Sequence, residues 1–323
     1  MKPNNPKRQG AFNDKVRGCL LGVAIGDALG APFEHLGPGE SNQFLDPTGG
    51  LIKDFHPYMG YPPGSWTDDT GMTLASCRAF IQMMRTGDTA EHCHRRAFYD
   101  WVGSPECRKP GKTVKRAAID GMPDPGAWGN GALMRISPVA AFCHAKKLDE
   151  KKSAKLAFKV AGLTHGHPLA TFPAVEFVLA LMSIFKGDNE VPENLSDPGK
   201  LCLSPGEEYA GYGVYCQKRH TEIDAVHPST GLWMWRHVLE RCLGLTEGSR
   251  WSSMPTFEEG ILKTVNESFD RDTAGAVAGA LLGAYWGESG IPEKWRTKVE
   301  KADPIMALAD AMIEASQMGG SLI

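Results

Sequence analysis

The sequence predicts an all-α protein built as one compact bundle of helices. Helical periodicity dominates the 323 residues, and the alternating runs typical of strands are scarce. Glycines also recur every four residues in two segments, a spacing that places them on one face of a helix. No shift in composition divides the chain. We therefore expect an N-terminal tail (1–15), one main domain (16–302) and a C-terminal helix (303–323).

The two glycine-striped segments predict two central helices in close contact. The first is Val16–Gly30, which ends before Pro32, and the second is Ala274–Gly287. Glycine costs up to ~1 kcal/mol relative to alanine inside a helix, so a stripe of glycines indicates that another backbone approaches closely. The stripes consist of Gly18, Gly22, Gly26 and Gly30 in the first segment and Gly275, Gly279, Gly283 and Gly287 in the second.

Helical periodicity also predicts eight further helices between and after these segments. They cover Thr70–Thr86, Thr89–Trp101, Gly131–His144, Ser153–Leu163, Ala170–Phe185, Leu232–Leu243, Thr256–Glu267 and Pro304–Gln317. Two segments lack such periodicity. Glu34–Ser65 is rich in glycine and proline and predicts a loop, and 187–230 predicts a long irregular surface excursion.

Composition and charge indicate the general class of the protein and its less favoured partners. An apolar content of 42% and a charged content of 23% are ordinary for a soluble globular protein. The net charge of −3 lacks the basic footprint of a nucleic-acid-binding protein, so nucleic acid is the less favoured partner. The N-terminus has no apolar signal core, and we expect no membrane span. Eight irregularly spaced cysteines are typical of reduced thiols, so we expect a cytoplasmic protein.

Two acidic clusters are the main candidates for chemistry. Thr67-Asp68-Asp69-Thr70 and Asp270-Arg271-Asp272-Thr273 each stand at the start of a predicted helix. One such side chain suffices to cap a helix, and an over-decorated cap is the alternative interpretation of either cluster alone. Together they offer six oxygen donors, which suit hard cations such as Mg²⁺ or Mn²⁺. Four acids facing one cavity would repel each other without a cation.

Other segments carry weaker signals. Asp27 is a candidate buried tether, and Glu34 could face the same cavity, although its spacing alone is typical of a solvated loop residue. Gly126–Arg135 is a glycine-rich loop before a helix, which predicts either a phosphate-binding loop or a plain turn. His165 and His167 could serve a ligand or could bond the carbonyls at a helix end.

Two further motifs are rejected. Lys109–Thr113 resembles the end of a phosphate-binding P-loop, but the glycine that this motif requires is Glu106 here. Glu91–His94 contains metal-ligand residue types without a second half at zinc-site spacing, and it is interpreted as a polar helix face.

The motifs, taken in order, resemble the ADP-ribosylglycohydrolase family, whose members include dinitrogenase reductase-activating glycohydrolases. The resemblance runs from Val16 to Trp295, and each motif is short while the ordered set is specific. It rests on Arg17–Gly22 (RGCLLG), Gly26–Gly30 (GDALG), Thr67–Met72 (TDDTGM), Gly129–Arg135 (GNGALMR), Thr164–His165, Asp270–Thr273 (DRDT) and Gly290–Trp295 (GIPEKW).

The resemblance implies an orthogonal helical bundle around two Mg²⁺ or Mn²⁺ ions, and hydrolysis of an ADP-ribosylated acceptor to release ADP-ribose. The implied metal ligands are Thr67, Asp68, Asp69, Asp270, Asp272 and Thr273. Glu34, Asp68 or Asp69 would activate water or carry the proton, and the sequence does not rank them. The implied substrate contacts are Gly126, Trp128, Gly129, Asn130, Gly131 and His165. ADP-ribosylarginine on a protein is the expected substrate.

The sequence departs from the family pattern at Phe269, where a glycine is frequent, and in the length of the 187–230 excursion. These departures leave open which acceptor is cleaved. Two alternatives to the expected function remain. One is a catalytically silent ADP-ribose-binding member of the same fold, and the other is a hydrolase of an ADP-ribosylated small molecule or nucleic acid, or of a free nucleotide or glycoside.

Overall fold

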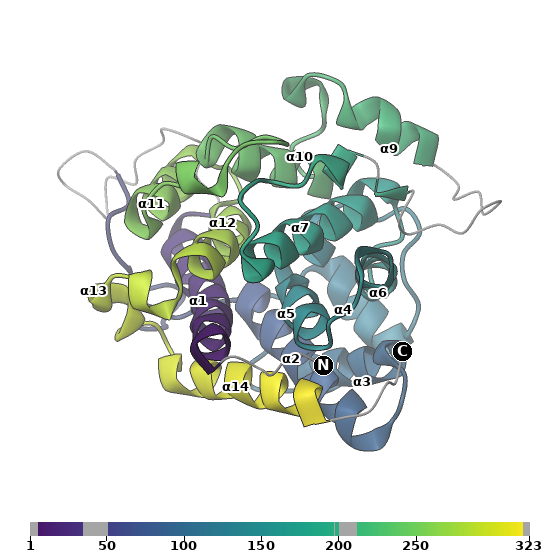
Figure 1. The fold of residues 1–323 in the computed structure, drawn as a ribbon, viewed down its shortest axis with the longest axis horizontal. Helices are drawn as coiled ribbons and strands as arrows, with labels where there is room; N and C mark the ends of the chain where they lie inside the picture. Colours follow the sequence, from purple (N-terminus) through teal and green to yellow (C-terminus); the bar gives the residue numbers. More distant parts are fainter. Residues whose placement is uncertain (1–5, 35–50, 197, 200–211, 319–323) are drawn as a thin grey trace.

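Helices surround a central antiparallel pair in the computed structural model (Figure 1). The model describes residues 6–34, 51–196, 198–199 and 212–318, and this part of the chain contains helices and isolated bridges but no β-strand. The α-helices are α1 (Pro6–Gly30), α2 (Asp68–Thr86), α3 (Ala90–Val102), α4 (Lys112–Asp120), α5 (Ser137–Ala145), α6 (Glu150–Gly162), α7 (Pro168–Lys186), α9 (Tyr212–Arg219), α10 (Gly231–Arg236), α11 (Phe257–Glu267), α12 (Arg271–Trp286), α13 (Glu293–Arg296) and α14 (Ala302–Met318).

The central pair is α1 and α12, and the glycine stripes form their contact. A Cβ atom built on Gly22 would lie 2.6 Å from the carbonyl carbon of Gly279, and one on Gly275 would lie 2.7 Å from the carbonyl carbon of Gly26. Neither helix could approach so closely with a side chain in between. The predicted contact between the striped helices is confirmed, and their antiparallel direction brings the end of α1 beside the start of α12.

The helix α7 forms a second part of the core, and it explains why part of the predicted excursion is ordered. Glu176 on α7 is fully buried and accepts a hydrogen bond from Trp235 Nε1 at 2.6 Å. Arg219, at the end of α9, pairs with the same carboxylate at 3.3 Å. The prediction of an irregular excursion over 187–230 is therefore wrong at 212–219, where the chain forms α9. Residues 197 and 200–211 lie outside the described part.

The N-terminal tail is also shorter than expected. The helix α1 begins at Pro6 rather than near residue 16, so the prediction of a tail over 1–15 is wrong from residue 6 onward; residues 1–5 lie outside the described part. Phe12 supplies the reason, because it is buried and its ring packs against His144 and Phe185 at centroid distances of 4.4 and 5.5 Å. The predicted C-terminal helix is present as α14 up to Met318, and residues 319–323 lie outside the described part.

Local differences concern how helices begin and continue. The predicted helix Gly131–His144 is split into a 3₁₀ helix (Asn130–Arg135) and α5, where Pro138 occupies the first turn and has no N–H to donate. The predicted helix Leu232–Leu243 consists of α10 followed by a π-helical turn. The short helices α4 and α13 were not predicted.

Two helices are long and apolar enough to cross a membrane by composition, although the sequence analysis expected no such segment. They cover Ala11–Phe33 and Pro168–Lys186. The apolar window of the first is 89% buried inside the bundle and that of the second is 100% buried, as in core helices of a soluble fold.

Candidate metal and substrate site

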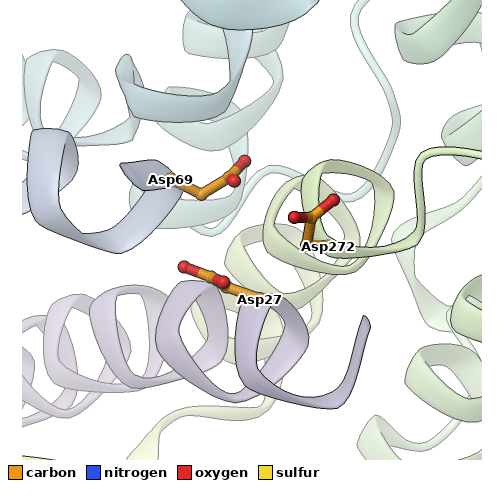
Figure 2. A group of neighbouring side chains, drawn as sticks. All are labelled: Asp27, Asp69 and Asp272. Carbon is orange, nitrogen blue, oxygen red and sulfur yellow. The ribbon is translucent and has the colours of Figure 1, made fainter. Parts of the chain in front are cut away.

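Three helices meet at one end of the central pair and bring carboxylates together. Asp27 stands next to Gly26 near the end of α1, Asp272 lies in the first turn of α12, and Asp69 lies in the first turn of α2. Figure 2 shows these three side chains approaching one another from their separate helices. The glycine contacts fix the separation of the first two, so the stripe and the acidic site are parts of one arrangement.

Asp27 holds the start of α2 in place. Its carboxylate accepts hydrogen bonds from the backbone N–H and the hydroxyl of Thr67 at 3.0 and 2.8 Å, and from those of Thr70 at 3.0 and 2.6 Å. A carboxylate at a helix N-terminus satisfies N–H groups that have no partner within the helix. The buried tether expected at Asp27 is thus confirmed, and the two threonines of the first cluster serve it.

The acids form two groups that share one member. The oxygens of Asp27, Asp69 and Asp272 lie within 4.8 Å of one another, as do those of Glu34, Asp270 and Asp272. The first group is buried throughout, and the second opens toward solvent through Glu34 and Asp270. The structure therefore brings together acids from both predicted clusters, together with Glu34.

The buried group fits a hard cation. Asp69 Oδ1 is buried and has no hydrogen-bond partner, and the three acids of this group offer oxygen ligands, which hard cations prefer. Burial, followed by the charges of Asp27, Asp68 and Asp270, raises the pKa of Asp69 well above 3.8. Burial and neighbouring carboxylates act in the same direction on the pKa of Asp272. A divalent cation would relieve both the missing partner and the repulsion.

The remaining predicted ligands lie around these groups. Asp68 belongs to neither three-acid group, and its Oδ2 accepts the N–H of Gly111 at 3.1 Å, while its charge still acts on Asp69. Burial is the largest cause that raises the pKa of Asp68 to about 7. The hydroxyl of Thr67 donates to Asp27 Oδ1 at 2.8 Å and lies 3.3 Å from Asp69 Oδ2, and Thr273 lies close enough to Asp69 to oppose the rise in its pKa.

The glycine-rich loop lies beside the second acidic group. Asn130 Nδ2 donates to Asp270 Oδ2 at 2.6 Å, and this bond links the loop to the acids. His165 lies beneath the loop, because a Cβ atom on Gly131 would come within 2.7 Å of its ring. Burial and the charge of Arg135 lower the pKa of His165 to about 3, so this imidazole is neutral at physiological pH. The N–H of Gly126 bonds Asp124 and forms a turn.

Trp128 presents an exposed indole at the edge of this loop. Its side chain is 46% exposed, and it stacks on His227 at a centroid distance of 5.7 Å and meets the edge of His167 at 6.0 Å. The N–H of Gly231 bonds the carbonyl of Trp128 at 3.0 Å. The end of the predicted excursion thus borders the site, a role that no motif in the sequence indicated.

A second contribution that the sequence analysis missed comes from the rejected P-loop fragment. Lys109 forms an ion pair with Glu34, and Gly111 supplies the bond to Asp68 described above. The only signal in the sequence was the unusual Lys-Pro-Gly-Lys run, which does not by itself indicate a position near the acids.

Comparisons with known proteins now bear on this arrangement. The family model described as ADP-ribosylglycohydrolase matches residues 8–321. The chain belongs to the ADP-ribosylglycohydrolase family. This result confirms the resemblance seen in the motifs, and a solved structure confirms the fold. That structure, an ADP-ribosylglycohydrolase-related protein complex, has a TM-score of 0.70 and 25% identity and covers 95% of this chain and 99% of its own.

Two of the following three curated relatives of this chain carry names that state a substrate, and the two substrates differ. ADP-ribosylarginine hydrolase Tri1 of Pseudomonas putida is 28% identical over 316 residues, which is 93% of this chain and 78% of the relative. ADP-ribosyl-[dinitrogen reductase] glycohydrolase of Rhodospirillum rubrum is 28% identical over 322 residues, covering 93% and 98%. ADP-ribosylhydrolase ARH3 of Bos taurus is 24% identical and covers 92% of each chain.

Proposed function

We propose that this ADP-ribosylglycohydrolase is a metal-dependent enzyme that cleaves the bond between the ribose of ADP-ribose and an acceptor, releasing ADP-ribose. ADP-ribosylarginine on a protein is the proposed substrate, since the Tri1 relatives carry that substrate in their names. The observation that carries the proposal is the pair of acidic groups sharing Asp272, with the unpartnered Asp69 Oδ1 in the buried one. We also propose a cytoplasmic setting, in line with the cysteine pattern of the sequence.

The proposed ligands of two Mg²⁺ or Mn²⁺ ions are Thr67, Asp68, Asp69, Asp270, Asp272 and Thr273. When bound, such ions would act as Lewis acids toward ribose hydroxyls and lower the pKa of a water molecule. Asp27 supports this set by holding the hydroxyl hydrogen of Thr67, so that the oxygen of Thr67 faces its neighbours as an acceptor.

The reaction needs a proton acceptor and stabilisation of positive charge at the anomeric carbon. Glu34, Asp68 and Asp69 are the proposed proton acceptors. Glu34 stands at the open side of the second acidic group, while Asp69 is buried in the first. The same carboxylates would stabilise the positive charge that develops as the glycosidic bond lengthens.

The loop Gly126–Gly131 is the proposed site for the ADP-ribose diphosphate, because small residues let phosphate approach the backbone N–H groups. His165 would support the loop from below as a neutral ring. The exposed indole of Trp128 would stack on the adenine, and Asn130 would hold Asp270 in its orientation toward the ribose.

A panel of substrates that differ only in the acceptor atom tests the proposal. ADP-ribosylarginine protein, ADP-ribosylserine peptide, an ADP-ribosylated nucleic acid end and a small ADP-ribosyl conjugate are incubated with the enzyme in Mg²⁺, Mn²⁺ or EDTA. We expect ADP-ribose release to be fastest from arginine and to be lost in EDTA. Asp69→Asn should abolish release, whereas Asp188→Asn, an exposed aspartate, should not change it.

The other outcomes of the panel separate the alternatives. Faster release of ADP-ribose from the small conjugate or the nucleic acid end than from arginine would identify that conjugate as the substrate. Tight binding of ADP-ribose without release from any conjugate would identify a silent binding protein. Absence of release from every substrate with either metal present would refute the proposed activity.

A further inference from the structure

The segment Gly103–Gly111, which we call the strap, connects α3 to α4 and runs past the acidic groups. Arg108 fixes its middle, because its guanidinium bonds both carboxylate oxygens of Glu300 at 2.5 and 2.9 Å and the carbonyl of Trp66 at 3.2 Å. Gly111 fixes its end through the bond to Asp68. Both anchors flank Lys109 in the sequence, so the backbone of Lys109 is held beside the site.

Lys109 itself reaches the second acidic group. Its ammonium pairs with Glu34, lies 4.9 Å from the centre of the Tyr58 ring and is close enough to Asp272 to be affected by its charge. The backbone of Lys109 has a φ of 45°, a left-handed conformation that is uncommon for a residue with a side chain. The strap thus adopts an unfavourable backbone conformation at the residue whose ammonium meets the acids.

The two acidic groups therefore differ in charge balance. Lys109 contributes one positive charge to the group of Glu34, Asp270 and Asp272. The carboxylate of Asp27 instead accepts hydrogen bonds from the N–H and hydroxyl groups of Thr67 and Thr70, and Asp69 Oδ1 has no hydrogen-bond partner. One group already holds a cationic side chain, and the carboxylates of Asp27 and Asp69 in the other are met by neutral donors.

We propose that Lys109 is a resident cation of the Glu34 group and makes this half of the centre the weaker of two sites for divalent cations. This inference rests on the metal centre proposed above. A divalent ion at the Glu34 group must displace the ammonium or share the carboxylates with it, and like charges only a few ångströms apart repel strongly in a partly desolvated site. At the Asp69 group the ion meets no such competitor. Loading is therefore sequential, and Glu34 leaves Lys109 only at the second step.

Binding of Mn²⁺ to the metal-free, full-length protein tests this assignment without any substrate. Isothermal titration calorimetry and the electron paramagnetic resonance signal of free Mn²⁺ are recorded for the wild type, Lys109→Gln, Lys109→Met and Lys109→Arg. Lys112→Gln is the matched control, since it removes the same charge from an exposed residue three positions along the chain. Thermal unfolding in EDTA shows whether each variant is folded.

For the wild type we expect a tighter and a weaker binding step. Both neutral variants should strengthen the weaker step by on the order of tenfold or more and leave the tighter step within about twofold. Lys109→Arg keeps the charge and should retain the weak step, and Lys112→Gln should superimpose on the wild type. Two neutral variants are included so that the measurement stands if one of them fails to fold.

The contrary results are distinct. An unchanged or weakened second step in folded neutral variants would overturn the role of Lys109 while leaving the metal centre intact. Equal strengthening of both steps, or the same change in Lys112→Gln, would show only a general charge effect and would also overturn it. No Mn²⁺ binding by the wild type would refute the metal centre itself, and the inference with it.

Discussion

Replacing Gly22 with alanine tests whether the glycine contact between α1 and α12 supports both the fold and the site. A Cβ atom at this position would lie 2.6 Å from the carbonyl carbon of Gly279 and closer still to its oxygen. Ordinary contact begins near 3.4 Å. The obstacle is backbone, so no side chain can rotate away and the helices must separate.

The expected loss of stability follows from two opposing terms. Overpacking of a close-packed core costs ~1–3 kcal/mol and occasionally more, and contact of backbone with backbone belongs at the upper end. Alanine is the better helix former and returns up to ~1 kcal/mol. We expect a net loss of about 2 kcal/mol in the free energy of unfolding, or a fall in Tm of about 3 °C for a protein of this size.

Calorimetric unfolding of the metal-free protein measures this change against a matched control. Gly162→Ala makes the same replacement at the last residue of α6, where a Cβ atom would meet nothing within 4 Å, so its Tm should stay the same or rise. Gly22→Ala should also weaken Mn²⁺ binding, because Asp27 and Asp272 move apart with their helices. A Tm for Gly22→Ala equal to that of Gly162→Ala would refute the argument from close packing.

Three further predictions concern the site. The pKa of Asp68 is raised to about 7 and that of Asp27 to about 6, mainly by burial, so the protonated acids stabilise the metal-free fold at low pH. This contribution to stability is lost as the pH rises from about 4 through 7. Thermal unfolding in EDTA should therefore show a lower Tm at pH 8 than at pH 5. A Tm that does not change between these pH values would contradict the prediction. Asp27→Ala removes the acceptor of four hydrogen bonds from Thr67 and Thr70. The variant should lower the free energy of unfolding, measured by urea denaturation, by on the order of 3–5 kcal/mol. A loss below about 1 kcal/mol would show that Asp27 does not hold the start of α2 in place. Trp128→Ala should weaken ADP-ribose binding roughly 5- to 100-fold in calorimetry, as expected for loss of one stacked base, while Trp286→Ala, a comparably exposed indole remote in sequence, should bind normally.

The sequence was sufficient to predict the central contact, because a period of four glycines has a direct geometric meaning. Gly18, Gly22 and Gly26 could only be tolerated in a helix that meets another backbone, and the structure shows that contact. The sequence was also sufficient to place both acidic clusters at helix starts, since such side chains favour those positions. These inferences depend on residues near one another in the chain.

Other parts of the site depend on packing between distant segments, which no local pattern reveals. Asp27 and Thr67 are 40 residues apart, and Lys109 and Glu34 are 75 apart. The helix α9 also depends on a distant segment, because Arg219 at its end pairs with Glu176 on α7. The sequence of α9 itself has no clear periodicity. The sequence analysis rejected Lys109–Thr113 as a P-loop because the required glycine is missing. The structure places Lys109 beside Glu34 and Gly111 beside Asp68, and both contacts depend on residues distant in the sequence.

The excess of glycine and the acidic site have a common cause. Asp27 follows Gly26 directly, and Asp272 precedes Gly275 by less than one helical turn, so the backbone separation at the stripe determines the separation of these carboxylates. Larger residues in the stripe would hold the two helices apart and move Asp272 away from Asp27. Because Asp272 belongs to both acidic groups, both would be disturbed. The glycines therefore cost helical stability along the contact between α1 and α12, and they bring the five acids of the two groups within reach of shared cations. A side chain in the stripe should accordingly impair cation binding even where the fold tolerates it.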